Sequence, residues 1–246
     1  MSRLRERVRD VRTVMWKERK GLLWSQGSRW RIVLPLLSPL FISIYIPWQA
    51  GIDWLEGYPS ILICVAIPLL FVGISIPESF AGERERHTLS TLLASRLPDN
   101  AILLGKLLSC VGFALMLLLP GLLIGAAVVN GVAWQGSVLF YRPIVLLVDL
   151  GLALLVGLLM GSVGILISLR SATVQGATQA LMGVFLVPPM VFGMVLMLFR
   201  DKVIPFLQGF GFAATLGTVF GVLVVGNVIL LLLAFNRFRR SKLLAN

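Results

Sequence analysis

The chain has few charged residues for its length. Charged side chains make up 13% of its 246 residues, whereas hydrophobic side chains make up 58%. Soluble globular domains carry about 25% charged and about 45–50% apolar residues. A chain with this composition has too little polar surface to cover its own core in water, so an ordinary soluble domain is excluded. We therefore expect an integral membrane protein, with lipid around much of the chain.

Residues that perform catalysis or bind metals are also scarce. The chain has one histidine, His87, and two cysteines, Cys64 and Cys110, which both lie in apolar runs. These numbers exclude a zinc site of the HExxH type, most histidine-based triads and a disulfide framework. The only Gly-Lys pair, Gly105 and Lys106, lacks the upstream glycine and the following Ser or Thr of a P-loop. We expect no catalytic activity, no cofactor and no metal site in this chain.

What the sequence does contain is a series of long apolar runs. A helix needs about 20 residues to cross a bilayer. Six runs predict six spanning helices, within residues 32–48, 58–77, 101–141, 143–169, 171–199 and 203–235. The third and the last run exceed one crossing, and the prolines and glycines of residues 205–212 indicate a short element that dips into the membrane before the sixth span. The predicted fold class is an all-α membrane bundle.

The positions of Lys and Arg predict how the bundle is oriented, because the cytoplasmic flanks of spanning helices are rich in these residues. The net charge is +11, and nineteen of the 22 Lys and Arg residues fall on one side of the six spans. Both termini share that side, which we assign to the cytoplasm. Since these charges flank spans, they do not indicate nucleic-acid binding. We expect one transmembrane domain in the cell (inner or plasma) membrane over residues 1–246, with an interfacial segment 1–30, the bundle 31–236 and a basic tail 237–246.

The N-terminal segment has the pattern of an amphipathic helix. Leu4, Val8, Val11 and Met15 recur at helical spacing, and Arg and Glu occupy most of the positions between them. Tryptophans at positions 16, 24 and 30 suit the headgroup region of a bilayer. We expect this helix to lie on the inner leaflet with its basic side chains facing anionic lipid.

The connection between the second and third spans carries another amphipathic pattern. Leu89, Leu92 and Leu93 share one helical face, and Pro98 ends that helix. A short helix held between two spans is able to transmit force from a soluble partner. Its leucines are equally suited to rest on the inner leaflet. The pattern alone leaves both interpretations open.

This connection resembles the corresponding loop of the ATP-binding-cassette type-2 permeases, which reads close to FAGERERGTLELLLASPVSRREILLGK. The matching residues are Phe80, Ala81, Gly82, Glu83, Arg84, Glu85, Arg86, Thr88, Leu89, Leu92, Leu93, Ala94, Ser95, Ile102, Leu103, Leu104, Gly105 and Lys106. Residues 16–37 are similar to the Lys- and Glu-rich helix that leads into the first span of this family. His87 and Ser90 depart from the pattern, since a small residue and an acidic residue are expected there.

The resemblance implies the permease subunit of an ATP-driven exporter. It implies two separate ATPase subunits, which bind ATP and Mg, and a second copy of this permease or a related one. It also implies that residues 83–95 form a coupling helix that docks into the ATPase through Glu83, Arg84, Glu85, Arg86, Thr88, Leu89, Leu92, Leu93 and Ser95. A second contact with the ATPase is expected at Trp16, Lys17, Glu18 and Arg19.

Other functions remain open on the residues themselves. Asp149 either has a structural role, reaching water or pairing with Arg142, or lies on a substrate path. Glu78 is expected to pair with a cytoplasmic base. A transporter or channel that needs no ATPase, and a non-transport membrane scaffold or assembly factor, are the alternatives to an exporter. Glycines four residues apart fit either packing within one subunit or a dimer interface; they are Gly121 and Gly125, Gly157 and Gly161, and Gly217 and Gly221.

Overall fold

The computed structural model describes residues 2–23, 30–88, 96–134, 136–199 and 212–238. These residues form helices and contain no strand. In chain order the helices are α1 (Ser2–Leu23), α2 (Trp30–Ala50), α3 (Asp53–Glu56), α4 (Ile61–Glu85), α6 (Asp99–Val132), α7 (Pro143–Ser168), α8 (Val174–Leu198) and α10 (Phe212–Arg237). The expected all-α class is confirmed for this part of the chain.

Five of these helices are long and apolar enough to cross a membrane. They are α4, α6, α7, the Val174–Val191 part of α8 and the Ala214–Arg237 part of α10. Helix α2 covers the run predicted as the first span but is not among the five, so the sixth crossing stays a prediction. The predicted dipping element falls on residues 205–212, which lie almost wholly outside the described residues.

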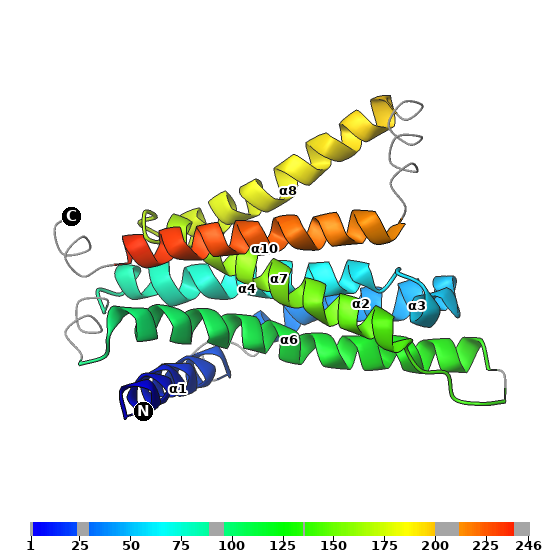
Figure 1. The fold of residues 1–246 in the computed structure, drawn as a ribbon, viewed down its shortest axis with the longest axis horizontal. Coiled ribbons are helices and arrows are strands. Elements are labelled where there is room, and N and C mark those ends of the chain that lie inside the picture. The colour runs from blue at the N-terminus through cyan, green and yellow to red at the C-terminus, as the bar shows by residue number, and fades with distance from the viewer. Residues whose placement is uncertain (1, 24–29, 89–95, 135, 200–211, 239–246) are drawn as a thin grey trace.

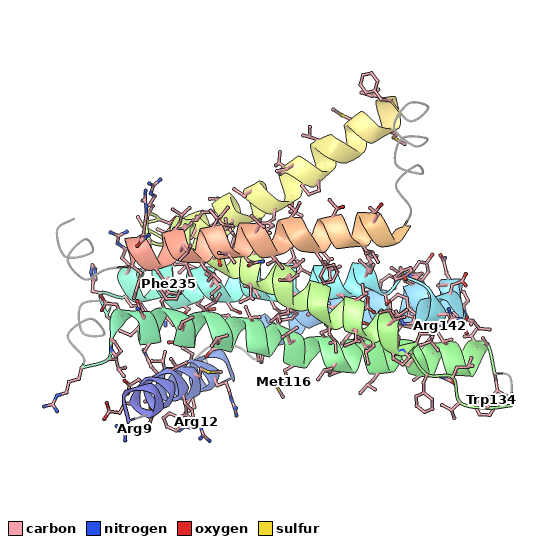
Figure 2. All side chains as sticks on the ribbon, viewed as in Figure 1. Arg9, Arg12, Met116, Trp134, Arg142 and Phe235 are labelled. Carbon is pink, nitrogen blue, oxygen red and sulfur yellow. The ribbon has the colours of Figure 1, made fainter. Side chains whose placement is uncertain are left out.

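Helices α4, α6, α7 and α10 lie side by side, α8 diverges from them along its length, and successive helices from α4 to α10 run in opposite directions (Figure 1). Helix α4 is central and packs against α2, α6, α7 and α8, while α10 packs against α7 and α1 lies across the first part of α6. One end of the bundle, here called the α1 end, holds α1, the end of α4, the start of α6 and the end of α10. The opposite end holds α3 and is called the α3 end. Figure 2 shows Arg9 and Arg12 at the α1 end, and Trp134 and Arg142 at the α3 end.

The ends of the helices follow from local chemistry. Helix α7 begins with Pro143, whose fixed φ and missing N–H suit the first helical position. Helix α6 has Asp99 in its first turn, where a carboxylate is favoured by the helix dipole. The long third apolar run is one 34-residue helix followed by a non-helical return, in which Asn130 exchanges two hydrogen bonds with the backbone of Leu139.

Glycines allow the helices to approach closely. A Cβ at Gly125 would lie 2.6 Å from Nε1 of the fully buried Trp54, and a Cβ at Gly161 would overlap Leu107. Gly121 and Gly157 likewise meet neighbouring side chains of this chain. These two pairs therefore serve packing within the subunit. Gly217 and Gly221, in contrast, meet nothing within 4 Å among the described residues.

Candidate functional site

The acidic and basic residues of the loop motif begin inside a spanning helix. Glu83, Arg84 and Glu85 form the last turn of α4, which continues beyond the predicted end of the second span at Pro77. A separate helix therefore does not start at Glu83. Proline is tolerated inside membrane helices because surrounding groups satisfy the freed carbonyl, and neither Pro68 nor Pro77 ends α4. Leu89, Leu92, Leu93 and Ser95 lie outside the described residues.

A tight turn follows α4 and sets the direction in which the loop leaves it. The N–H of His87 donates to the carbonyl of Arg84 at 3.0 Å, and the N–H of Thr88 donates to that of Glu83 at 2.9 Å. This pair of bonds is the Schellman arrangement, in which the residue after the helix adopts the left-handed conformation. His87 has a φ of 57°. The family pattern has a small residue at this position, and a glycine there meets no steric strain.

The centre of the site is Lys106, whose side chain is 1% exposed although it carries a charge. Its Nζ lies 3.2 Å from Glu18 Oε1 and 3.0 Å from Glu83 Oε1. It also donates to the carbonyl of Ser79 at 2.7 Å and to Ser79 Oγ at 3.0 Å. The ring of Phe80 faces the same ammonium group at 5.1 Å. Lys106 thus joins α1, α4 and α6 in one buried contact.

Lys17 and Ser79 complete this arrangement. Lys17 Nζ lies 3.0 Å from Glu83 Oε1, and Ser79 Oγ donates to Glu18 Oε2 at 3.0 Å. Two ammonium groups and two carboxylates balance in formal charge. We call the set of Lys17, Glu18, Ser79, Glu83 and Lys106 the charge cluster. Removing one member of a buried pair leaves the other charge uncompensated, so such clusters depend on every partner.

The cluster changes the interpretation of the N-terminal segment. Of the four residues expected to contact the ATPase, Glu18 has a 12% exposed side chain directed into the bundle, and it binds Lys106. Trp16 and Arg19 are exposed, and so is Lys17, although its Nζ reaches Glu83. Because Glu18 is engaged inside the chain, it holds α1 against α4 and α6 and does not present its carboxylate to a partner.

The other charged motif residues attach α4 to further helices. Arg84 Nη1 donates to the carbonyl of Leu169 at 3.0 Å, directly after the end of α7. Glu85 Oε2 accepts from the N–H of Val174 at 3.1 Å, the first residue of α8. A carboxylate at a helix N-terminus satisfies an unpaired N–H and interacts favourably with the helix dipole. The last turn of α4 is therefore joined to α1, α6, the end of α7 and the start of α8.

Arg86 and Thr88 lie in the turn and are exposed. Arg86 Nη2 lies 3.8 Å from Glu78 Oε1, so the expected pairing of Glu78 with a base is confirmed, although both side chains are exposed and the contact is weak. Glu83, Arg84 and Glu85 are occupied by contacts within the chain. Glu85 stays exposed while it accepts from Val174, as do Arg86 and its partner Glu78.

Sequence reasoning missed Lys106 and Ser79 as members of the site. A lysine followed by 35 uncharged residues was a usable signal, since a buried ammonium group requires a carboxylate partner. The partner could not be chosen from spacing, because Glu18 precedes Lys106 by 88 residues and lies in a different helix.

Asp149 lies away from the charge cluster, in the part of α7 nearer the α3 end. Its side chain is fully buried, and neither carboxyl oxygen has a hydrogen-bond partner among the described residues. The expected pairing with Arg142 is not observed, because Arg142 Nη2 lies 3.4 Å from Glu56 Oε2. Within the described ranges, no group of three or more His, Cys, Asp or Glu residues could hold a metal ion.

Comparison with known proteins places the chain in a family. Residues 10–209, which include the second part of α1, the charge cluster and Asp149, match the family described as ABC-2 family transporter protein. No curated protein matches the chain. The match covers most of the chain and agrees with the resemblance found in the loop after α4. The protein is a multi-pass membrane protein and belongs to the ABC-2 transporter family.

Proposed function

We propose that this chain is the permease subunit of an ATP-driven exporter. Two copies, or this chain and a related permease, form the translocation path in the cell membrane and associate with two ATPase subunits that bind ATP and Mg. The α1 end, which holds the start of α1 and the end of α10, faces the cytoplasm. Residues 83–95 connect the permease to the ATPase, although the first three of them belong to α4.

The charge cluster is the observation that carries this proposal. Lys106 lies between Glu18 of α1 and Glu83 of α4, next to the turn that leads into the loop. A displacement of the loop therefore moves α1, α4 and α6 as one unit. Arg84 and Glu85 extend the connection to α7 and α8. A loop that only rested on lipid would not require its base, the end of α4, to be joined to four other helices.

The energetic requirement on the permease is small. ATP binding draws the two ATPase subunits together, and this favours whichever permease conformation fits the closed pair better. Only a difference in affinity between the two permease states is needed to shift their populations. The buried cluster keeps α1 and the end of α4 together when the loop is displaced. The difference in affinity for the closed ATPase pair therefore changes the arrangement of the spanning helices.

The experiment replaces Leu89, Leu92 and Leu93 together with serine. The permease is reconstituted with its ATPase in inside-out vesicles, and hydrolysis is measured beside accumulation of a hydrophobic dye that the unaltered protein exports. We expect membrane insertion and ATP hydrolysis to persist and dye accumulation to be lost. Replacing Met116, Leu119 and Leu123 with serine is the matched control, since these side chains are exposed on the spanning helix α6. Unchanged coupling in the loop variant contradicts the proposal.

Two other functions give different results in the same vesicles. A transporter that needs no ATPase accumulates dye on an ion gradient after ATP has been removed. A scaffold or assembly factor shows no change in ATPase rate when a transported compound is added. The apolar character of α6, α8 and α10, which carry no charged residue over residues 107–132, 174–198 and 212–236, argues against ion coupling through those helices.

A further inference from the structure

Asp149 is a buried acid that the proposed coupling does not use. Both of its carboxyl oxygens lack a hydrogen-bond partner among the described residues, and so does the hydroxyl of the buried Ser60. Ser60 precedes α4, and Cys64 lies in its first turn; these two side chains face the Asp149 carboxyl across the contact between α4 and α7. Polar groups in such a position are normally paired.

The groups that surround Asp149 do not neutralise it. The phenol of Tyr141 is near, but its oxygen accepts from Trp54 Nε1 at 2.7 Å and donates to the carbonyl of Leu122 at 3.0 Å. Arg142 is engaged by Glu56. The described parts of α6, α8 and α10 contribute no charged residue at this depth, and α10 meets α7 here through Phe220 against Gly151. Among the described residues, the titratable groups that face Asp149 are therefore Cys64 and Tyr141, and neither is a cation.

An ionised carboxylate in this position would have neither water nor a positive partner, which is costly in an apolar environment. A proton removes the charge and adds an O–H donor, for which Ser60 Oγ and Cys64 Sγ are acceptors. We propose that Asp149 is a proton-binding site: its carboxyl holds a proton while α4 and α7 are packed together, and it releases that proton to water when the two helices separate at the α3 end. The O–H bond breaks, water takes the proton and the carboxylate remains.

Helix α4 links this site to the charge cluster. Cys64 lies in its first turn and Glu83 in its last, and these residues are about 29 Å apart at 1.5 Å per helical residue. A movement that the loop imposes on Glu83 is therefore transmitted toward the residues that cover Asp149. The release of the proton during a transport cycle rests on the proposed function, whereas the binding of the proton in the packed form does not.

The first experiment measures the carboxyl directly in the full-length protein in lipid nanodiscs without any ATPase. Infrared spectra of the unaltered protein and of Asp149→Asn are compared between neutral and alkaline pH. We expect a protonated-acid C=O band in the unaltered protein that the variant lacks and that shifts in D₂O. Asparagine is uncharged and similar in shape, so the variant resembles the protonated form and keeps the fold. A carboxylate band in place of the acid band overturns the proposal.

The second experiment uses Cys64 as a reporter of the same contact. Cys110→Ala leaves Cys64 as the only thiol, and maleimide labelling then measures how often α4 and α7 separate. Raising the pH favours the form in which Asp149 has lost its proton and the two helices have separated. The labelling rate of Cys64 therefore rises by up to about tenfold per pH unit, in addition to the increase that any thiol shows as its thiolate fraction grows. Asp149→Asn in the same background has the ordinary response alone. Equal pH dependence in the two proteins overturns the release step.

The two readouts separate this inference from the exporter proposal. If the chain has no ATPase partner, the infrared band and the labelling difference are unaffected, because neither measurement contains ATP. If the band is absent, the charge cluster and its coupling to the loop are untouched.

Discussion

His87 occupies the position at which the backbone must turn away from α4. A residue with a Cβ is strained in the left-handed conformation by about 1–2 kcal/mol, whereas glycine is not. The two hydrogen bonds that Arg84 and Glu83 accept hold the turn in that conformation. The direction in which the chain leaves α4 is therefore fixed by the backbone, and histidine at this position makes the turn strained.

The turn predicts the effect of two substitutions that both remove the imidazole. His87→Gly is expected to be more stable than His87→Ala by about 1 kcal/mol, because only alanine keeps the Cβ that strains the turn. The free energy of unfolding in an SDS titration of the detergent-solubilised protein measures the difference. Equal stability of the two variants would show that residue 87 leaves the left-handed conformation without loss.

Lys106 is the residue on which the charge cluster depends. Among the described residues, Lys106→Met leaves Lys17 as the one cation in contact with Glu18 and Glu83, so we expect a loss of about 3–5 kcal/mol in unfolding free energy. The double variant Lys106→Met and Glu18→Gln restores the balance of charge and is expected to recover a large part of that loss. Lys20→Met is the control, because Lys20 is exposed and only covers the ring of Trp16. If the double variant is less stable than Lys106→Met, the carboxylate was not the source of the cost.

At the scale of elements, α1 is docked on the bundle as well as suited to a membrane surface. Val14 is buried against Gly105, where a Cβ would lie 2.6 Å from Val14 Cβ and 3.2 Å from the carbonyl oxygen of Val11. The charge cluster lies beside this contact. Gly105 and Lys106 are the last two residues of the stretch that resembles the family pattern. That stretch therefore contains both the apolar contact with Val14 and the ionic contact with Glu18 that dock α1.

Gly105→Ala is expected to displace α1. The added methyl group meets a short branched side chain and a backbone oxygen, and overpacking of this kind costs about 1–3 kcal/mol. Hydrogen exchange at the backbone amides of α1 measures the loss of docking. Gly112→Ala in the same helix has open space at its Cβ and is expected to leave exchange unchanged. Adding Val14→Ala to Gly105→Ala is not expected to restore slow exchange, because alanine keeps the Cβ that lies 2.6 Å from the added methyl group.

The helices were largely predictable because apolar runs of membrane length leave the backbone no alternative but to bond within a helix. Their ends were less so. The second span was expected to stop at Pro77, yet α4 reaches Glu85, since the residues after Pro77 find partners on α1, α7 and α8. Those partners are distant in sequence, and no local pattern contains them.

At the scale of the whole molecule, the same limit applies to the candidate site. The loop motif identified Glu83, Arg84 and Glu85 as important but assigned them to an external partner. The fold shows that they join helices of this chain, because Lys106 and Glu18 have no other way to keep their charges away from lipid. Under the proposed function, Glu85 and Arg86 are the exposed charges at the end of α4 that remain open to an ATPase.

The assembly is the last prediction, and it concerns the complete complex. We expect a P-loop ATPase to co-purify with this chain in mild detergent. The native mass of the complex is expected to equal that of two ATPases plus two permeases, and each permease has about the 27.0 kDa of this chain. Coupling also requires an intact charge cluster. A loop that is no longer fixed to the helices at its base transmits no force to them, even when the loop still binds the ATPase. Lys106→Met is therefore expected to retain the ATPase and lose ATP-driven dye accumulation, whereas serine at positions 89, 92 and 93 weakens retention as well. A chain that purifies without any ATPase and exports dye after ATP is exhausted contradicts the assembly.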